Sequence, residues 1–417
     1  MKRPLERSQA HVESATGLAA PAAAASAGPA VFTLLVLAGL LSGLPVPAPL
    51  MGQSLFSSGG IGAPTDAPDG RARMLGGVGL GLSGAYYSPL DPAAAGRLVL
   101  PGISASMESS SEVFGDDDPT GRTRFPFFGI AYPYRGNVYT LGFTGVLSQE
   151  WRTQVDRVID FGDGLLVDAV DRFESEGGIG SAQVGMARQL APAFSVGANV
   201  GWYLGSVERS FERQLDPVEV GSEVEFFRVG GLWRAEGNSI TGSASWQMSS
   251  TIRLGAGATW SSDLDLVPEG ETTGETVSVP MPLVLRIGGY AALTPGLGLT
   301  ASVSRADWSD AAAALDDADA PGAVLQWGVG AEWTGGTLRD RRVPLAVGYR
   351  SGDLPFSFLG EAATESAVTG GFGIHLAETE GVPLALAHVG LERGSRQAGA
   401  AEETFWRTTV TFRISAR

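Results

Sequence analysis

The stretch FSVGANVGWYLG, residues 194–205, alternates strictly between two kinds of side chain. Every second residue from Phe194 onward is apolar, whereas the residues between them are Ser, Gly and Asn, with Tyr203 as the exception. Successive side chains of a strand point to opposite faces, so this period of two predicts a β-strand with one apolar and one small or polar face. Its length is close to the ~9–11 residues with which a tilted strand crosses the hydrocarbon core of a membrane.

The same alternation recurs along most of the chain. It is clear in LQWGVGAEW at 325–333, in IRLGAGATWS at 252–261 and in WRTTVTFRIS at 406–415. Segments with similar patterns lie at 138–147, 239–248, 283–292, 297–304, 343–350, 367–375 and 382–392. Counting the segments gives about 14 to 16 strands. Residues 152–178 and 206–236 do not resolve into clear strands.

The second face of these strands distinguishes a membrane barrel from a soluble sandwich. In a soluble protein that face would meet water and carry Lys, Glu and Arg, but here it is mostly Gly, Ser, Thr and Ala. Small side chains suit a crowded concave lumen, and the apolar face would then meet lipid. Trp and Tyr recur near the strand ends, as in interfacial aromatic girdles. We therefore predict an all-β fold, a transmembrane antiparallel β-barrel of about 14 strands.

The expected connections between strands are of two kinds. Tight turns are predicted at 135–137, 191–193, 249–251 and 294–296. Longer, acidic loops are predicted at 108–123, 209–222, 263–276, 306–322, 351–365 and 393–403. Short turns on one side and long loops on the other are typical of outer-membrane barrels.

The amino-acid composition argues against several classes of function. A formal net charge of −16 argues against binding of nucleic-acid phosphates. The chain has no cysteine, which removes disulfides, thiolate metal sites and a cysteine nucleophile. Charged residues make up only 18% of the chain, few for a soluble protein of this size.

The N-terminus has the pattern of an export signal. Lys2, Arg3 and Arg7 form a basic region, an apolar run covers 31–44, and small residues follow. The run is shorter than the ~20 apolar residues of a spanning helix, and prolines at 45, 47 and 49 interrupt it. We predict that residues 1–52 are a cleaved signal peptide and that the mature protein reaches the cell outer membrane. A transmembrane anchor is the alternative.

The segment RMLGGVGLGLSGAYYSPLDPAAAGRL, residues 73–98, resembles the start of the FadL-like family of outer-membrane barrels. That family has an Asn-Pro-Ala motif where this chain has Asp91, Pro92 and Ala93. The segments VPLAVGYRSGDLPFSF (343–358) and VTGGFGIHL (368–376) are similar to its late strands. LALAHVGLERGSRQ (384–397) resembles the closing hairpin of related barrels, PorV-like secretion components among them.

The resemblance implies how the chain is divided. Residues 53–97 would form an N-terminal arm and luminal plug, or hatch, and residues 98–417 the transmembrane barrel. Within the hatch, the resemblance marks the motif Asp91, Pro92 and Ala93 and the plug glycines Gly76, Gly77, Gly79 and Gly81.

In that family a strand irregularity opens a lateral path to the membrane. Here Pro126 and Pro133 flank the second strand candidate, and proline cannot donate to a ladder, so this strand is the candidate for a lateral opening. Two ordinary strand-end prolines are the alternative.

The function implied by the resemblance is passive uptake of hydrophobic small molecules, such as long-chain fatty acids, by a monomer in outer-membrane lipid. A lumen lined by Gly, Ser and Thr with few charges would be a poor ion channel but could hold a plug or an apolar ligand. The alternative is a PorV-like accessory that binds protein partners in secretion. No cofactor, metal or nucleic-acid partner is expected.

Three further sequence patterns have simpler interpretations than a binding or catalytic site. Residues 79–84 match G-x-G-x-x-G, but strands rather than a helix follow, so nucleotide binding is not expected. His375 and His388 could serve a lipid hydrolase, yet no G-x-S-x-G elbow is present and no particular Ser is indicated. The Asp runs at 116–118 and 316–319 could bind calcium, but solvated loop acid is the simpler interpretation. We therefore expect that the protein is not an enzyme.

Overall fold

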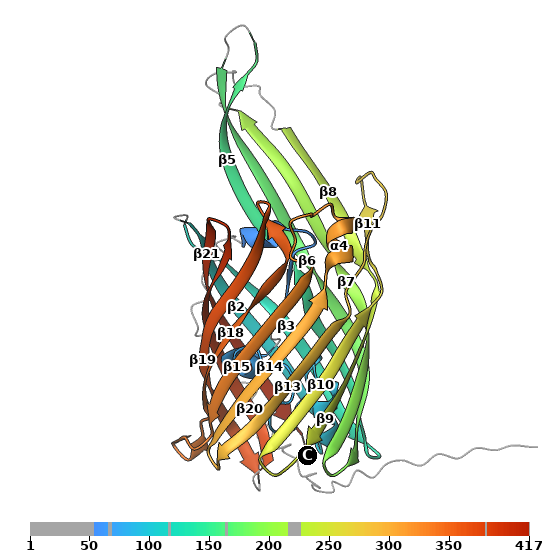
Figure 1. The fold of residues 1–417 in the computed structure, drawn as a ribbon, viewed down its shortest axis with the longest axis vertical. Coiled ribbons are helices and arrows are strands. Elements are labelled where there is room, and N and C mark those ends of the chain that lie inside the picture. Colours follow the sequence, from blue (N-terminus) through green and yellow to red (C-terminus); the bar gives the residue numbers. More distant parts are fainter. Residues whose placement is uncertain are drawn as a thin grey trace, which may run out of the picture. The chain divides into compact units, whose positions relative to one another are not determined.

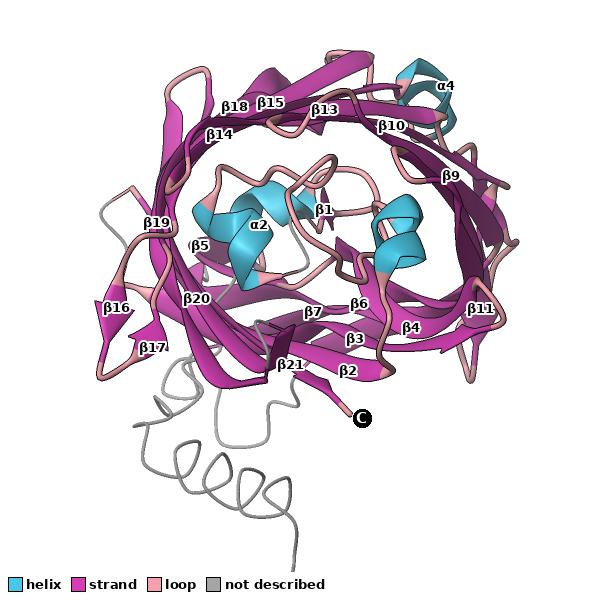
Figure 2. Ribbon diagram, turned by 90° about the horizontal axis from the view of Figure 1, so that it is seen from below, coloured by secondary structure: helices cyan, strands magenta, loops and turns pink. Residues whose placement is uncertain are grey.

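The computed structural model describes residues 54–65, 69–115, 118–162, 166–215, 227–379 and 382–416. The predicted signal peptide, residues 1–52, lies outside this range. Within it, fourteen strands close into an antiparallel barrel (Figures 1 and 2). In ring order these are β2 (Gly102–Phe114), β3 (Thr120–Tyr134), β4 (Asn137–Ser148), β6 (Leu166–Ala191), β7 (Phe194–Leu215), β9 (Asn238–Gln247), β10 (Ile252–Ser261), β13 (Val284–Thr294), β14 (Leu297–Asp307), β15 (Ala323–Trp333), β18 (Leu345–Phe358), β19 (Glu361–Thr379), β20 (Val382–Ala398) and β21 (Ala401–Ser415).

The barrel closes where β2 pairs with β21, from Gly102 opposite Ser415 to Phe114 opposite Glu403. The short turns, such as Arg135–Gly136, lie at one end, which we call the turn end, and we call the opposite end the loop end. Helices in the described residues are short, and none is long and apolar enough to cross a membrane. They are η1 (Leu55–Ser58), α2 (Gly70–Met74), η2 (Pro92–Arg97) and α4 (Ser309–Ala314).

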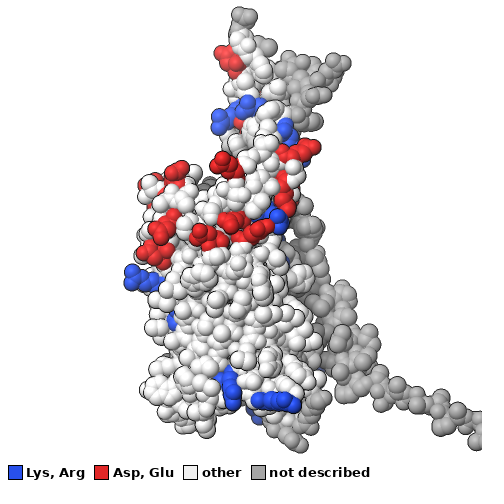
Figure 3. Space-filling view, turned by 90° about the vertical axis from the view of Figure 1, so that its right-hand side faces the viewer, with Lys and Arg blue, Asp and Glu red and all other residues white. Residues whose placement is uncertain are grey.

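The large apolar side chains of the strands face outward, as the alternation predicts. On β7, Val200, Trp202 and Leu204 are 41%, 46% and 49% exposed, whereas Tyr203 is 6% exposed and points inward. Figure 3 shows a broad uncharged band on one face of the molecule, with Asp and Glu gathered above it and Arg below it. Such a band is the surface that a transmembrane barrel presents to hydrocarbon.

A charge placed on this band should be costly. Val347 on β18 is 65% exposed on the outer wall, and Val347→Arg is expected to lower the free energy of unfolding by up to about 4 kcal/mol, the cost of an arginine at the bilayer midplane. The control is Val158→Arg, a site 63% exposed on β5 (Trp151–Asp160), outside the barrel. Denaturant titration of both variants in lipid vesicles is the measurement. Equal costs at the two sites would contradict the membrane assignment.

An extension of the sheet rises beyond the barrel at the loop end (Figure 1). β6 and β7 continue past the rim and are flanked there by β5 and β8 (Phe227–Glu236). β11 (Leu264–Glu269) pairs with β8, and β12 (Val277–Val279) pairs with β11. These are the stretches whose alternation was unclear, because Arg and Glu occur on the outer face where the barrel strands carry apolar residues. Phe173, Phe211 and Phe227 form an aromatic row across the sheet.

Three of the predicted acidic loops are wrong, and strands also occupy 209–215 (β7) and 264–269 (β11) of the loops predicted at 209–222 and 263–276. Residues 108–114 and 120–123 belong to β2 and β3, and 393–398 and 401–403 to β20 and β21. β18 and β19 likewise replace most of the loop predicted at 351–365, and Leu359–Gly360 is a tight turn at the loop end. The acidic composition of these stretches predicts solvent exposure, but the acidic side chains at even-numbered positions of β2, Glu108 and Glu112, point into the lumen.

Candidate functional site

Residues 69–98, which precede β2, lie inside the ring of strands (Figure 2), and we call them the luminal segment. Asp69 caps the N-terminus of its helix α2, and the Asp69 side chain accepts hydrogen bonds from the backbone N–H groups of Arg71 and Ala72. This N-cap fixes the first turn and directs two arginines at the wall. Arg71 binds Glu332 of β15 through two hydrogen bonds of 2.9 and 2.7 Å.

The second arginine, Arg73, is fully buried and joins a cluster of paired charges. Its guanidinium lies 2.6 Å from Glu108 of β2 and 2.8 Å from Glu392 of β20, the two sides of the closing seam. Further pairs extend this arrangement, for example Arg124 with Glu108 at 2.7 Å and Arg396 with Glu365 at 2.6 Å. We call it the seam cluster; its members are Arg73, Glu108, Arg124, Arg350, Glu365, Glu392, Arg396, Glu403 and Arg407.

No sequence pattern considered above predicts the seam cluster, and the expectation of a lumen with few charges is wrong where this cluster lies. A usable signal existed. Glu392 and Arg396 are four residues apart, as are Glu403 and Arg407, so each pair shares one face of its strand. On β21, the face that carries Glu403 and Arg407 also carries the buried Thr409 and Thr411, which indicates that these charges point into the lumen.

The glycines of the luminal segment meet glycines of the wall. The carbonyl oxygen of Gly76 lies where a Cβ on Gly328 would be 1.9 Å away, and Gly76 has a φ of +76°, which disfavours other residues. Gly81, with a φ of +73°, makes the same kind of approach to Gly288. Gly77 and Gly79 line the cavity beside this contact. Small inward residues therefore permit backbone-to-backbone packing inside the barrel.

The motif Asp91, Pro92 and Ala93 fastens the other end of the segment. Asp91 is buried and accepts hydrogen bonds from the hydroxyl of Ser243 on β9, at 2.9 Å, and from the N–H of Gly81, at 3.2 Å. Ala93 donates its N–H to the same Ser243 hydroxyl at 2.8 Å, and Pro92 packs against Gly197 of β7. Burial raises the pKa of Asp91, although the hydrogen bonds that it accepts act in the opposite direction.

Asp91→Ala is expected to destabilise the protein by about 1–3 kcal/mol, because Ser243, Gly81 and Tyr86 lose their acceptor. Asp91→Asn keeps one acceptor oxygen and should cost less than about 1 kcal/mol. Unfolding monitored by tryptophan fluorescence compares the two variants. Equal losses would mean that the negative charge, rather than the acceptor, holds the motif.

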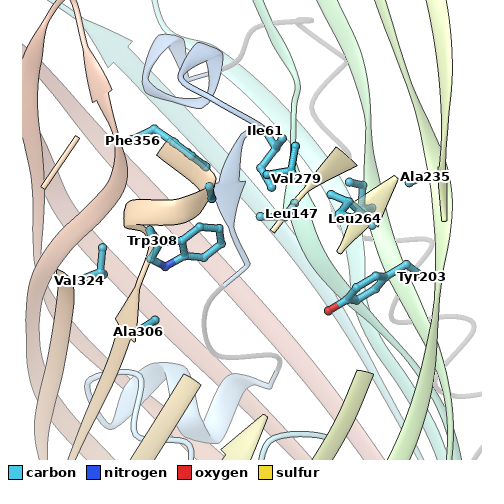
Figure 4. Packing of buried hydrophobic residues seen from close by; sticks show 12 residues of the cluster. Ile61, Leu147, Tyr203, Ala235, Leu264, Val279, Ala306, Trp308, Val324 and Phe356 are labelled. Carbon is cyan, nitrogen blue, oxygen red and sulfur yellow. The ribbon is translucent and has the colours of Figure 1, made fainter. Parts of the chain in front are cut away.

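An apolar cluster lies across the lumen near the loop end (Figure 4), and we call it the mouth cluster. Trp308, beside α4, packs edge-on against Phe356 of β18 with ring centroids 5.5 Å apart. The cluster comprises Ile61, Leu147, Ile179, Tyr203, Ala235, Leu264, Val279, Ala306, Trp308, Ala311, Val324 and Phe356. The mouth cluster therefore presents buried apolar side chains at this end of the lumen.

Two cavities border the luminal segment. The loop-side cavity, of about 170 Å³, lies between residues 76–80 and the wall of β13, β14, β15 and β18, and reaches Trp308 of the mouth cluster. The turn-side cavity, of about 720 Å³, lies between residues 83–103 and the wall near the turn end. Both have mixed apolar and polar linings, so each can accommodate a small amphipathic or apolar ligand.

The two candidate prolines of β3 have different surroundings. Pro133 pairs opposite Val138 close to the turn, an ordinary strand-end place. Pro126 lies at a register shift against β2, and the ladder between β3 and β4 stops beside it at Phe127 opposite Thr144. Beyond that point β4 pairs instead with β1 (Ala63–Pro64) of the N-terminal segment.

The two described histidines lack a nucleophile. His375 lies 3.1 Å from Glu378, and the Nδ1 atom of buried His388 has no hydrogen-bond partner among the described residues. In the same part of the chain, no three His, Asp or Glu side chains are placed to hold a metal ion. The serine–histidine arrangement required for the hydrolase alternative is therefore not found in the described residues.

Comparisons with known proteins agree with this architecture. A family model described as BamG matches residues 33–278, more than half of the chain. A search of curated proteins finds no match. Among solved structures, the CymD monoaromatic hydrocarbon channel is similar with a TM-score of 0.52 and 15% identity, over 88% of this chain and 98% of that one.

Two further structures show the same likeness. The Pseudomonas putida toluene transporter TodX gives a TM-score of 0.51 at 12% identity, over 88% of this chain and 99% of that one. A Pseudomonas aeruginosa FadL homologue gives 0.51 at 12% identity, over 85% and 99%. At these identities the likeness shows a shared fold, and it confirms the predicted resemblance to FadL-like barrels at that level.

Proposed function

The chain belongs to the BamG family, and we propose that it is an outer-membrane channel for passive uptake of hydrophobic small molecules. The interrupted ladder between β3 and β4 carries this proposal. The structures that share the fold include channels named for toluene and monoaromatic hydrocarbons, which supports the same general activity here. Long-chain fatty acids are a second candidate class of solute, expected from the resemblance.

The route begins at the mouth cluster and continues into the loop-side cavity. Pro64 and Thr65 line this cavity, so displacement of β1 would connect it to lipid between β3 and β4, where β1 replaces the missing part of the ladder. Thr65 donates its N–H to Val146 of β4 at 2.8 Å and accepts a hydrogen bond from Arg124 of β3 at 3.3 Å. Residues 63–65 therefore act as a short gate strand, held by few hydrogen bonds, whose displacement opens the wall laterally.

A reversible cross-link tests the gate. The chain has no cysteine, so Ala63→Cys with Ser148→Cys introduces one possible disulfide between opposed residues of β1 and β4. Uptake of labelled toluene and of a labelled fatty acid into liposomes should fall at least about tenfold on oxidation and recover on reduction. The control pair is Ala398→Cys with Ala401→Cys, opposed at a remote turn. Unchanged uptake in the oxidised gate pair would overturn the lateral route, and no uptake by wild type would overturn the channel.

A protein-binding accessory is the second candidate, favoured by the extension of β5–β8. This sheet rises beyond the barrel rim, carries the aromatic row Phe173, Phe211 and Phe227, and contributes nothing to the two cavities. Replacing the extension by short turns should leave uptake unchanged if the channel proposal is right. Loss of a co-purifying outer-membrane protein in that variant, with no uptake by wild type, would favour the accessory.

A further inference from the structure

The turn-side cavity is lined by more positive than negative side chains. Four arginines line it, against one carboxylate, Glu332. Three of the four have acidic partners: Arg71 binds Glu332, Arg413 lies 3.3 Å from Asp69, and Arg342 lies 3.4 Å from Glu378. The fourth, Arg97 at the end of η2, has no acidic partner among the described residues.

Arg97 is held by a neutral group alone. Its Nη1 donates to the amide oxygen of Gln247 at 3.3 Å, while its Nε and Nη2 atoms are buried and lack an acceptor in the described part of the chain. Arg253 donates to the same Gln247 oxygen at 2.9 Å, and its other hydrogen bonds go to the carbonyls of Leu82 and Gly84. Two guanidinium groups thus converge on one uncharged oxygen, an arrangement that favours an external anion.

The rest of the cavity is suited to a hydrocarbon chain. Leu98, Leu100, Ala131 and Leu386 line it, and its volume of about 720 Å³ exceeds that of a single acyl chain. Buried hydrogen-bond donors beside an apolar cavity are typical of a binding site for an amphiphile. An anionic head group accepts hydrogen bonds from the donors, and the apolar tail fills the cavity. A neutral hydrocarbon would leave the donors of Arg97 unsatisfied.

We propose that the turn-side cavity is a binding site for an anionic amphiphile, with a carboxylate or phosphate head at Arg97 and an apolar tail along the cavity. The inference deepens the proposed function and rests on it for how the ligand arrives, but not for binding itself. It places a holding site at the turn end, away from the gate strand.

Binding is measured by calorimetry on the full protein in phosphatidylcholine nanodiscs, with dodecanoate, dodecyl phosphate and dodecanol as probes. At least one anionic probe should bind at least about tenfold more tightly than dodecanol, and the preferred anion identifies the head group. Arg97→Gln should remove most of this preference. The control is Arg342→Gln, which lines the same cavity but is paired with Glu378, and it should retain the preference.

A second variant covers the case in which Arg97→Gln does not fold. Gln247→Glu supplies an internal carboxylate to both Arg97 and Arg253, so anion binding should fall at least about tenfold while the melting temperature rises. Equal binding of dodecanol and the anions, or undiminished anion binding in both variants, would overturn the site. Anion binding by a protein that shows no liposome uptake would keep the site and overturn the channel.

Discussion

Arg73→Ala is expected to release the luminal segment from the barrel seam and to lower the free energy of unfolding by about 3 kcal/mol or more. Arg73 has no exposed side-chain surface and binds Glu108 and Glu392 from opposite sides of the seam. Both carboxylates would lose a buried donor, and the cavity left behind could not be filled without movement of α2. The loss should appear as a lower unfolding temperature and as increased ion conductance in planar bilayers.

The control for Arg73 is Arg393→Ala on the same strand as Glu392. Arg393 points outward, and its guanidinium lies 5.0 Å from the ring centre of Trp406, a contact worth about 0.5–1 kcal/mol at an exposed site. It should leave conductance at the wild-type level. A thermal shift no larger in Arg73→Ala than in the control would show that the seam cluster does not hold the segment.

Gly328→Ala is the second change with a large expected effect. The new Cβ would lie 1.9 Å from the carbonyl oxygen of Gly76, and the two groups in conflict belong to backbones, so no side-chain rotation relieves the clash. We expect a loss of about 3 kcal/mol, or displacement of residues 69–98 with faster cleavage by an added protease.

Gly242→Ala on β9 provides the matched control, because a Cβ there meets no atom within 4 Å. Protease digestion and conductance should both separate the two alanine variants. If Gly328→Ala were as stable and as resistant as Gly242→Ala, the close approach of Gly76 to the wall would be wrong.

The outer wall of the barrel could be predicted from the sequence because lipid requires an apolar side chain at every second position of each strand. Trp202 and Leu204 alternate with inward residues, and this period alone identifies strands and their lipid face. The count of about 14 strands is confirmed, because each crossing repeats the same pattern. The alternation is absent where the strands leave the membrane. The strands of the extension, with ion pairs such as Arg152 with Glu174, therefore could not be predicted from the sequence.

The interior was harder to predict, because its pattern depends on contacts between distant residues. Glu365 and Glu403 belong to acidic stretches that are typical of solvated loops. Their ion pairs with Arg396, from another part of the sequence, allow both glutamates to be buried in the lumen. The change of partner along β4, from β3 to β1, also depends on residues far apart in the sequence. Pro126 indicates where the pairing with β3 stops, but no local pattern identifies Ala63 and Pro64 as the residues that replace it. The roles predicted for the hatch motif and the lateral opening stay predictions until the gate is tested.

The seam has a consequence for biogenesis. Glu108 of β2 lies beside Thr409 of β21, 301 residues later in the sequence, and Arg73 precedes both. The ring therefore cannot close, nor Arg73 find both acidic partners, until nearly the whole chain has been translocated. Until that moment a periplasmic chaperone would have to shield an open sheet edge and an unpaired cation, so wall closure and docking of the segment should occur as one kinetic step.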